Sequence, residues 1–172
     1  MLLDRDGLKA DLYRRTVGHN ESHVLVPLAD IEATLAARAG NRGIGVEVAN
    51  TTKVADLAPH LDSLALIAIA FPSFSDGRGF SIAKSLRNAG FRGTLRAVGP
   101  LIADQFAYAL ACGFDEVELP AESAARQPIE IWLAAARAFR ATYQRNHNPA
   151  GASILDRRWA AKLGAAKLGA AE

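Results

Sequence analysis

Short apolar runs alternate with amphipathic runs about five times along the chain, and this alternation constrains the fold most strongly. The clearest apolar run is LALIAIAF, residues 64–71, which has no polar residue on either face. Such a run is typical of a central strand in a parallel sheet. Repeated strand–helix units favour right-handed crossovers. We therefore expect a single α/β domain with a mainly parallel sheet of about five strands. It is expected to be an open doubly wound sheet with helices on both faces or, alternatively, a partial TIM-like barrel with consecutive strands side by side.

The element boundaries follow from periodicity and from capping residues. The expected strands are residues 23–28, 44–50, 64–71, 93–98 and 115–119; the expected helices are 30–40, 54–63, 80–90, 100–113 and a last helix from Pro128 through Phe139 to Tyr143. Asp30 is expected to cap the first helix, Pro100 to stand near the start of the fourth, and Gly113 to end it. The polar residues Glu116 and Glu118 suggest that the last strand lies at an edge of the sheet.

The two ends of the chain lack this pattern. Residues 1–20 are polar and unpatterned, whereas residues 21–146 hold the alternating runs and form the expected α/β domain. Residues 147–172 form a low-complexity tail that repeats Lys-Leu-Gly-Ala-Ala, in which glycine weakens any helix. We expect this tail to be disordered or to dock through Trp159.

Composition and charge exclude several classes of protein. The net charge is only +2, without the clustered Lys and Arg of a nucleic-acid surface, so no nucleic-acid partner is expected. No apolar run approaches the roughly 20 residues of a membrane helix, and the first residues do not resemble a signal peptide. We expect a cytoplasmic protein without a membrane partner. The single cysteine, Cys112, allows no internal disulfide, and the four histidines lack metal-site spacing, so no metal is expected.

Arg96 is the most informative charged residue. It lies inside a short expected strand, where an unpaired guanidinium would cost many kcal/mol. We expect Asp76 to be its partner, with Glu118 or Asp104 as the alternative. Two interpretations stay open: a structural ion pair between two loops, or a site where Arg96 and Arg78 offer forked donors to an anion.

The turn DGRG, residues 76–79, stands between a buried strand and a helix. Gly77 and Gly79 would allow a positive φ or a close backbone approach, and the helix start that includes Ser81 would attract an anion. Neither a dinucleotide fingerprint nor a Walker loop is present, since Ile82 replaces the third glycine and no Gly-Lys-Ser/Thr follows. A phosphate cradle and a simple capped turn are both consistent with the turn.

Ligands of parallel sheets bind outside the carboxyl ends of the strands, and the polar residues of three loops fall there. Asp104 and Gln105 begin the fourth helix, and Tyr108 one turn later is placed to hydrogen-bond to Asp104. We expect Asp76, Arg78, Arg96 and Asp104 to form one cluster in which Arg78 stays exposed. The full candidate ligand site is Asp76, Gly77, Arg78, Gly79, Ser81, Arg96, Asp104, Gln105 and Glu118.

The stretch FPSFSDGRGFSIAKSLRNAGFRGTLRAVGPLIADQFAYALACGFDEVEL resembles a bacterial family of unknown function. Its members are commonly labelled oxidoreductases involved in sulfite reduction, because their genes neighbour those of sulfite reductase and phosphoadenylyl-sulfate reductase. The match runs from about Val24 to Leu119. The family signature falls on Phe71, Pro72, Asp76, Gly77, Arg78, Gly79, Ser81, Arg96, Gly99, Asp104, Gln105, Cys112 and Gly113.

The resemblance implies an accessory or enzymatic component of assimilatory sulfite or sulfate reduction. Together with the polar loops, it suggests binding of a small anion or a phosphate-bearing ligand. The alternative is a non-catalytic partner of the sulfite reductase system whose Arg/Asp cluster is purely structural. Possible partners are sulfite reductase, related enzymes of the pathway, a small anion and a second copy of the chain. Only the family label suggests an oxidoreductase, and the cofactor stays open because no flavin, nicotinamide, haem or iron–sulfur motif is recognisable.

Overall fold

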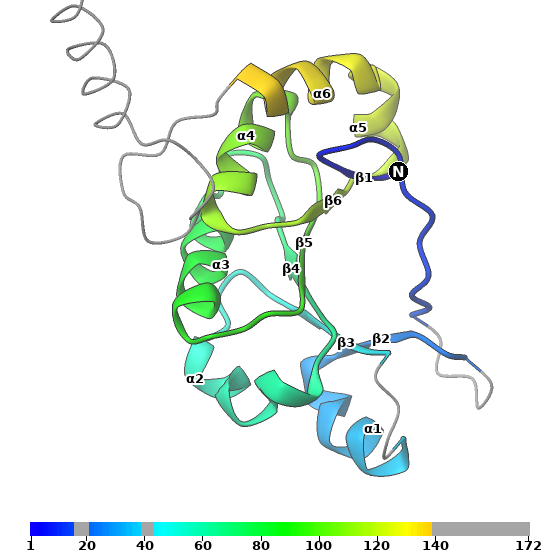
Figure 1. Cartoon of the computed structure of the whole chain (residues 1–172), viewed down its shortest axis with the longest axis vertical. Coiled ribbons are helices and arrows are strands. Elements are labelled where there is room, and N and C mark those ends of the chain that lie inside the picture. Colours follow the sequence, from blue (N-terminus) through cyan, green and yellow to red (C-terminus); the bar gives the residue numbers. More distant parts are fainter. Residues whose placement is uncertain (16–20, 39–42, 139–172) are drawn as a thin grey trace, which may run out of the picture.

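The computed structural model describes residues 1–15, 21–38 and 43–138. These residues form a single α/β domain around a six-stranded sheet with the strand order β1-β6-β5-β4-β3-β2 (Figure 1). The strands from β2 to β6 are parallel, and β1 joins β6 in the antiparallel direction. The sheet stays open and does not close into a barrel. The expected α/β class with a mainly parallel sheet is therefore confirmed.

The elements follow the expected alternation. The strands are β1 (Leu2–Asp4), β2 (Val24–Pro27), β3 (Ile44–Val48), β4 (Leu66–Ala70), β5 (Thr94–Val98) and β6 (Glu116–Glu118). The helices are α1 (Ile31–Ala37), α2 (Val54–Leu57), α3 (Arg78–Asn88), α4 (Ala103–Cys112), α5 (Ala121–Arg126) and α6 (Ile129–Ala138), with 3-10 turns η1 (Leu28–Asp30) and η2 (Ala58–Ser63). Neither β1 nor α5 was predicted, and α4 begins three residues after Pro100. Gly113 ends α4 with a positive φ of 106°, as expected. Phe139, Tyr143, Trp159 and the tail lie outside the described residues.

The helices of the consecutive crossovers cover one face of the sheet. From β2 to β6 the chain always steps to the neighbouring strand in the same direction, and right-handed crossovers that step the same way place their helices on the same side. Figure 1 shows α2, α3 and α4 on one side of the strands and the N-terminal chain (blue) on the other. The core packs Ile67, Ile69 and Leu95 of the sheet with Leu86 of α3 and Phe106 of α4. The helices of these crossovers therefore do not cover both faces, as a doubly wound sheet would require. Consecutive strands lie side by side, as in the barrel-like alternative, but the sheet is open.

The opposite face of the sheet is crossed by residues 9–15, which we call the N-terminal strap. The Lys9 amide donates to the Leu2 carbonyl of β1, and Arg14 forms a parallel bridge with Val24 of β2. The strap therefore reaches both edges of the sheet. It covers a small apolar cluster that includes Leu66 and is packed against Tyr13.

β6 lies between β1 and β5, so the expectation of an edge strand is wrong. The charged residues of β6 face the strap rather than solvent at an edge. Because sheet side chains alternate between faces, Glu116 and Glu118 lie on the strap side, and Val117 joins the helix-side core.

Candidate functional site

Arg96 lies on the strap side of β5, and its side chain is almost completely buried, with the residue 1% exposed. Its Nε donates to Glu116 Oε1 at 2.8 Å, and its Nη1 donates to Glu118 Oε2 at 3.0 Å. Nη1 and Nη2 also donate to the two carboxylate oxygens of Asp11, at 3.0 and 2.9 Å. The expected burial and the alternative partner Glu118 are confirmed. The expected partner Asp76 is wrong, because Arg96 points away from the helix side of the sheet and toward the strap.

Further charged residues extend this cluster along the strap. Lys9 Nζ donates to Glu116 Oε2 at 2.5 Å, and Arg15 joins Glu47 through Nε at 2.8 Å. Arg15 also donates to both oxygens of Glu118, at 2.8 and 3.0 Å. We call these residues the sheet-face network: Lys9, Asp11, Arg15, Glu47, Arg96, Glu116 and Glu118.

The electrostatics of the sheet-face network favour its charged form. Burial alone would raise the pKa of Asp11 and of Glu118, but hydrogen bonds from Arg96 to Asp11 and from Arg15 to Glu118 hold both below their ordinary values. Burial would lower the pKa of Arg96, and the bonds to Asp11 and Glu116 outweigh it, so that pKa is raised. Arg96 thus makes four hydrogen bonds to three carboxylates. Little of its donor capacity is left for an anion.

Asp76 and Arg78 form a separate pair at the start of α3. Arg78 donates to Asp76 through Nε at 2.9 Å and through Nη2 at 2.6 Å, and the Arg78 amide donates to Oδ1 at 3.3 Å. The Arg78 side chain is 60% exposed, as expected. Its guanidinium, with help from the amide of Asn50, holds the pKa of Asp76 well below its usual range. The Asp76 carboxylate therefore occupies the end of α3 at which an external anion was expected.

Gly77 and Gly79 of the turn differ in the space around them. Neither Gly77 nor Gly79 has a positive φ, so that part of the expectation is wrong. The close approach is real at Gly79, where an added Cβ would lie 2.5 Å from the Phe71 ring. At Gly77 the nearest atom would be a Phe80 ring carbon at 3.6 Å, which is an ordinary contact.

The remaining predicted site residues lie on the outer parts of α3 and α4. Ser81 and Asp104 are exposed and make no hydrogen bond through their side chains to any described residue. Gln105 accepts from the Ile102 amide and donates to the Phe74 carbonyl at 2.7 Å, which fixes the loop after β4. Tyr108 does not pair with Asp104.

The Tyr108 side chain instead lies beside Cys112, whose thiol raises the pKa of the tyrosine. Burial raises the pKa of the Cys112 thiol, which disfavours its thiolate form.

The predicted site residues thus fall into three groups instead of one cluster. Arg96 and Glu118 belong to the sheet-face network; Asp76, Gly77, Arg78, Gly79 and Ser81 open α3; and Asp104 and Gln105 open α4. The residues that were missed are Lys9, Asp11, Tyr13, Arg15, Glu47, Asn50 and Glu116. Two sequence features could have indicated these residues. The segment KADLYRR, residues 9–15, is dense in charges, and Glu47 and Glu116 lie within expected strands.

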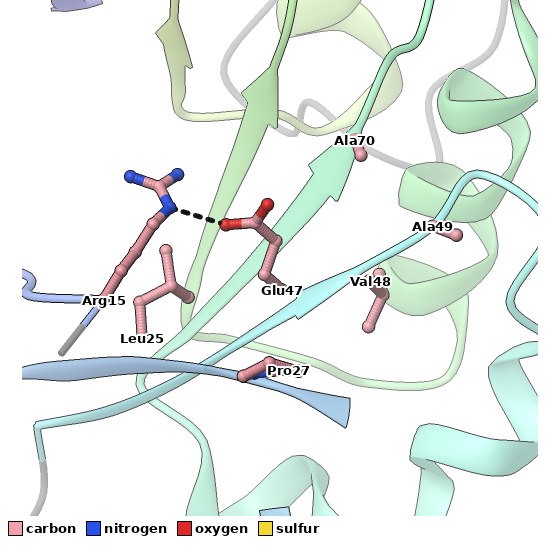
Figure 2. A pocket seen from close by; sticks show the side chains of 7 residues that line it. All are labelled: Arg15, Leu25, Pro27, Glu47, Val48, Ala49 and Ala70. Atoms are coloured by element: carbon pink, nitrogen blue, oxygen red, sulfur yellow. Dashed lines mark hydrogen bonds and ion pairs between the residues drawn. The ribbon is translucent and has the colours of Figure 1, made fainter. Parts of the chain in front are cut away.

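A cavity of about 340 Å³ opens on the strap side, at the carboxyl ends of β2, β3 and β4 (Figure 2). Arg15 and Glu47 are its charged lining residues, and the rest of the lining is apolar.

Within residues 1–15, 21–38 and 43–138, no group of three or more His, Cys, Asp or Glu side chains is placed to hold a metal ion. Every helix in the described part of the chain is too short or too polar to cross a bilayer.

Comparison with known proteins places the chain in a family. No curated protein matches it. A family model covers residues 45–152, a span that runs from the second residue of β3 through α6 and includes Arg96, Glu116 and the turn at Asp76. The N-terminal strap lies before this span. The chain belongs to the family described as "Bacterial protein of unknown function (DUF934)".

Proposed function

We propose that this chain is a non-catalytic accessory protein of assimilatory sulfite reduction that acts by binding the sulfite reductase system. The observation that carries the non-catalytic part is the saturation of Arg96 by Asp11, Glu116 and Glu118. An arginine that makes four of its five possible hydrogen bonds to carboxylates of the same chain has little capacity left to bind a substrate. The pathway rests on the sequence resemblance alone.

The surface that we assign to the partner lies around the exposed rings of Phe74 and Tyr108, which are 55% and 57% exposed. Gln105 holds the carbonyl of Phe74, and Tyr108 lies three residues further along α4, on the same side of that helix. Exposed aromatic residues are enriched at protein interfaces. The loop of Phe74 also belongs to the stretch that resembles the family.

A binding experiment with purified sulfite reductase from the same organism tests this proposal. We expect the two proteins to co-elute in size-exclusion chromatography and the reductase rate to change when the chain is added. The double variant F74S/Y108S should weaken the complex by about tenfold or more, because central aromatic contacts dominate interface energies. The control I131S changes another exposed apolar side chain, on α6, and should bind normally. Absence of a complex at micromolar concentrations would reject the proposal.

A small-anion site at the exposed guanidinium of Arg78 is the second candidate. The Arg78 side chain is 60% exposed, and its Nε and Nη2 donate to Asp76. Its Nη1 has no hydrogen-bond acceptor among the described residues and is the donor left for an anion. Calorimetric titration with sulfite, sulfate and a nucleotide phosphate decides the matter, since no saturable heat at millimolar concentration would exclude this site.

A further inference from the structure

We propose that the cavity beside Glu47 binds a small organic amine, in which a compact apolar body carries one protonated amino group. This inference does not depend on the proposed docking function, because the cavity lies on the strap side of the sheet and α4 lies on the helix side. The position suits a ligand, since parallel sheets bind ligands outside the carboxyl ends of their strands.

The size of the cavity limits the body of the ligand. Its volume of about 340 Å³ falls at the lower end of ordinary ligand pockets. A dry cavity of about 150 Å³ already holds benzene, so one ring with a short side chain fits this cavity. The small side chains of Ala49 and Ala70 leave the space open, and Leu25 and Pro27 belong to the apolar lining.

Glu47 supplies the polar contact. Its Oε2 accepts the Nε proton of Arg15 at 2.8 Å, while its Oε1 has no hydrogen-bond donor among the described residues. Figure 2 shows Glu47 in the middle of the lining residues, with one carboxylate oxygen turned toward Arg15 and the other turned away from it. A ligand in this cavity therefore meets a free acceptor.

Arg15 does not offer a matching site for an acid. Its two terminal nitrogens, Nη1 and Nη2, already donate to Glu118. The sheet-face network contains three basic residues (Lys9, Arg15 and Arg96) against four acidic residues (Asp11, Glu47, Glu116 and Glu118), which gives a net charge of −1. The excess carboxylate favours a cation and disfavours an anion.

Three probes of matched shape test the charge preference: 2-phenylethylamine, 2-phenylethanol and 3-phenylpropanoate. In NMR titrations of the full chain we expect the amine to bind with a Kd of about 1 mM or tighter, as its size allows. The shift changes should centre on the amides of Glu47, Ala49 and Ala70. The alcohol and the acid should bind at least about tenfold more weakly, because they lack the charge-assisted bond.

Two variants locate the site. Glu47→Gln should weaken amine binding by about tenfold or more through loss of the carboxylate charge. Ala70→Leu should abolish binding by filling the cavity, and Glu122→Gln on exposed α5 is the control for an acid elsewhere. Circular dichroism and the urea midpoint identify a variant that fails to fold, and Glu47→Gln and Ala70→Leu change different properties of the site. Equal binding of the acid or the alcohol, unchanged affinity in Glu47→Gln, or no amine binding at about 10 mM would overturn the proposal.

Discussion

At the residue scale, Arg96 shows how one buried charge organises its surroundings. Its guanidinium is held by Asp11 from the strap, by Glu116 and Glu118 from β6, and by the Tyr13 ring 5.6 Å from its central carbon. Glu116 is itself 2% exposed. Because both members of the Arg96–Glu116 pair are desolvated, removal of either one leaves a charge that water cannot reach.

Replacement of Arg96 by Met should lower the free energy of unfolding by about 3–5 kcal/mol, since the partner carboxylates then lose their buried cation. Urea unfolding followed by circular dichroism measures this loss. The matched control is Arg78→Met, which removes an exposed arginine from a pair with Asp76. Its urea midpoint should barely change, because exposed ion pairs contribute little. Equal midpoints for the two variants would contradict a structural role of Arg96.

At the element scale, the contact between α3 and the end of β4 depends on Gly79. The Phe71 ring follows β4 and packs against the first turn of α3, with Phe80 4.9 Å away between ring centroids. There is no room for a Cβ at Gly79, whose missing side chain lets the helix approach the ring. Gly79 therefore allows the first turn of α3 to pack closely against Phe71.

Substitution of Gly79 by Ala should destabilise the domain by about 1–3 kcal/mol, as overpacking does in well-filled cores. Gly77→Ala is the matched control two residues earlier, where the φ of −82° suits alanine and space is available. The difference between the two midpoints in thermal or urea unfolding is the quantity to measure. If Gly77→Ala proved the more damaging change, the turn would have a role other than packing.

At the scale of the whole molecule, the two faces of the sheet are stabilised by different forces. The helix side is an apolar core, whereas the strap side combines a small apolar patch with the sheet-face network. The strap thus depends on ionised carboxylates. The contacts between the strap and the sheet should therefore depend on pH more strongly than the apolar core on the helix side does.

Stability should therefore fall in acid. The pKa values of Asp11 and Glu118 are lower in the folded chain than their ordinary values, so their stabilisation is complete above about pH 4.5. It is lost as the pH falls through the lowered folded values. Urea unfolding at a series of pH values from neutral to about pH 3 measures the slope, and Asp11→Asn should flatten it. A stability that rises on acidification, or an unchanged slope in Asp11→Asn, would contradict this account of the strap.

The sequence by itself determined the features that depend on local physics. The apolar run of β4 and the helical periodicity of α3 and α4 report burial along neighbouring residues, so the α/β class and most elements were predictable. The need of Arg96 for a carboxylate was also predictable, because the cost of an unpaired buried charge does not depend on the partner. The sequence of the DGRG turn was compatible with close packing at Gly79 and equally with a positive φ.

Only the tertiary structure decided which residues meet. Asp11 lies 85 positions before Arg96, in a segment without a periodic pattern, and β1 is too short at three residues to show one. The strand order depends on the direction of each crossover, which no local pattern encodes, and this order placed the helices together on one face. In the sequence, Asp76 is a plausible partner for Arg96 because it follows the neighbouring expected strand. The two were separated because alternate residues of β5 face opposite sides of the sheet, so that Arg96 meets the strap while the turn at Asp76 leads into α3.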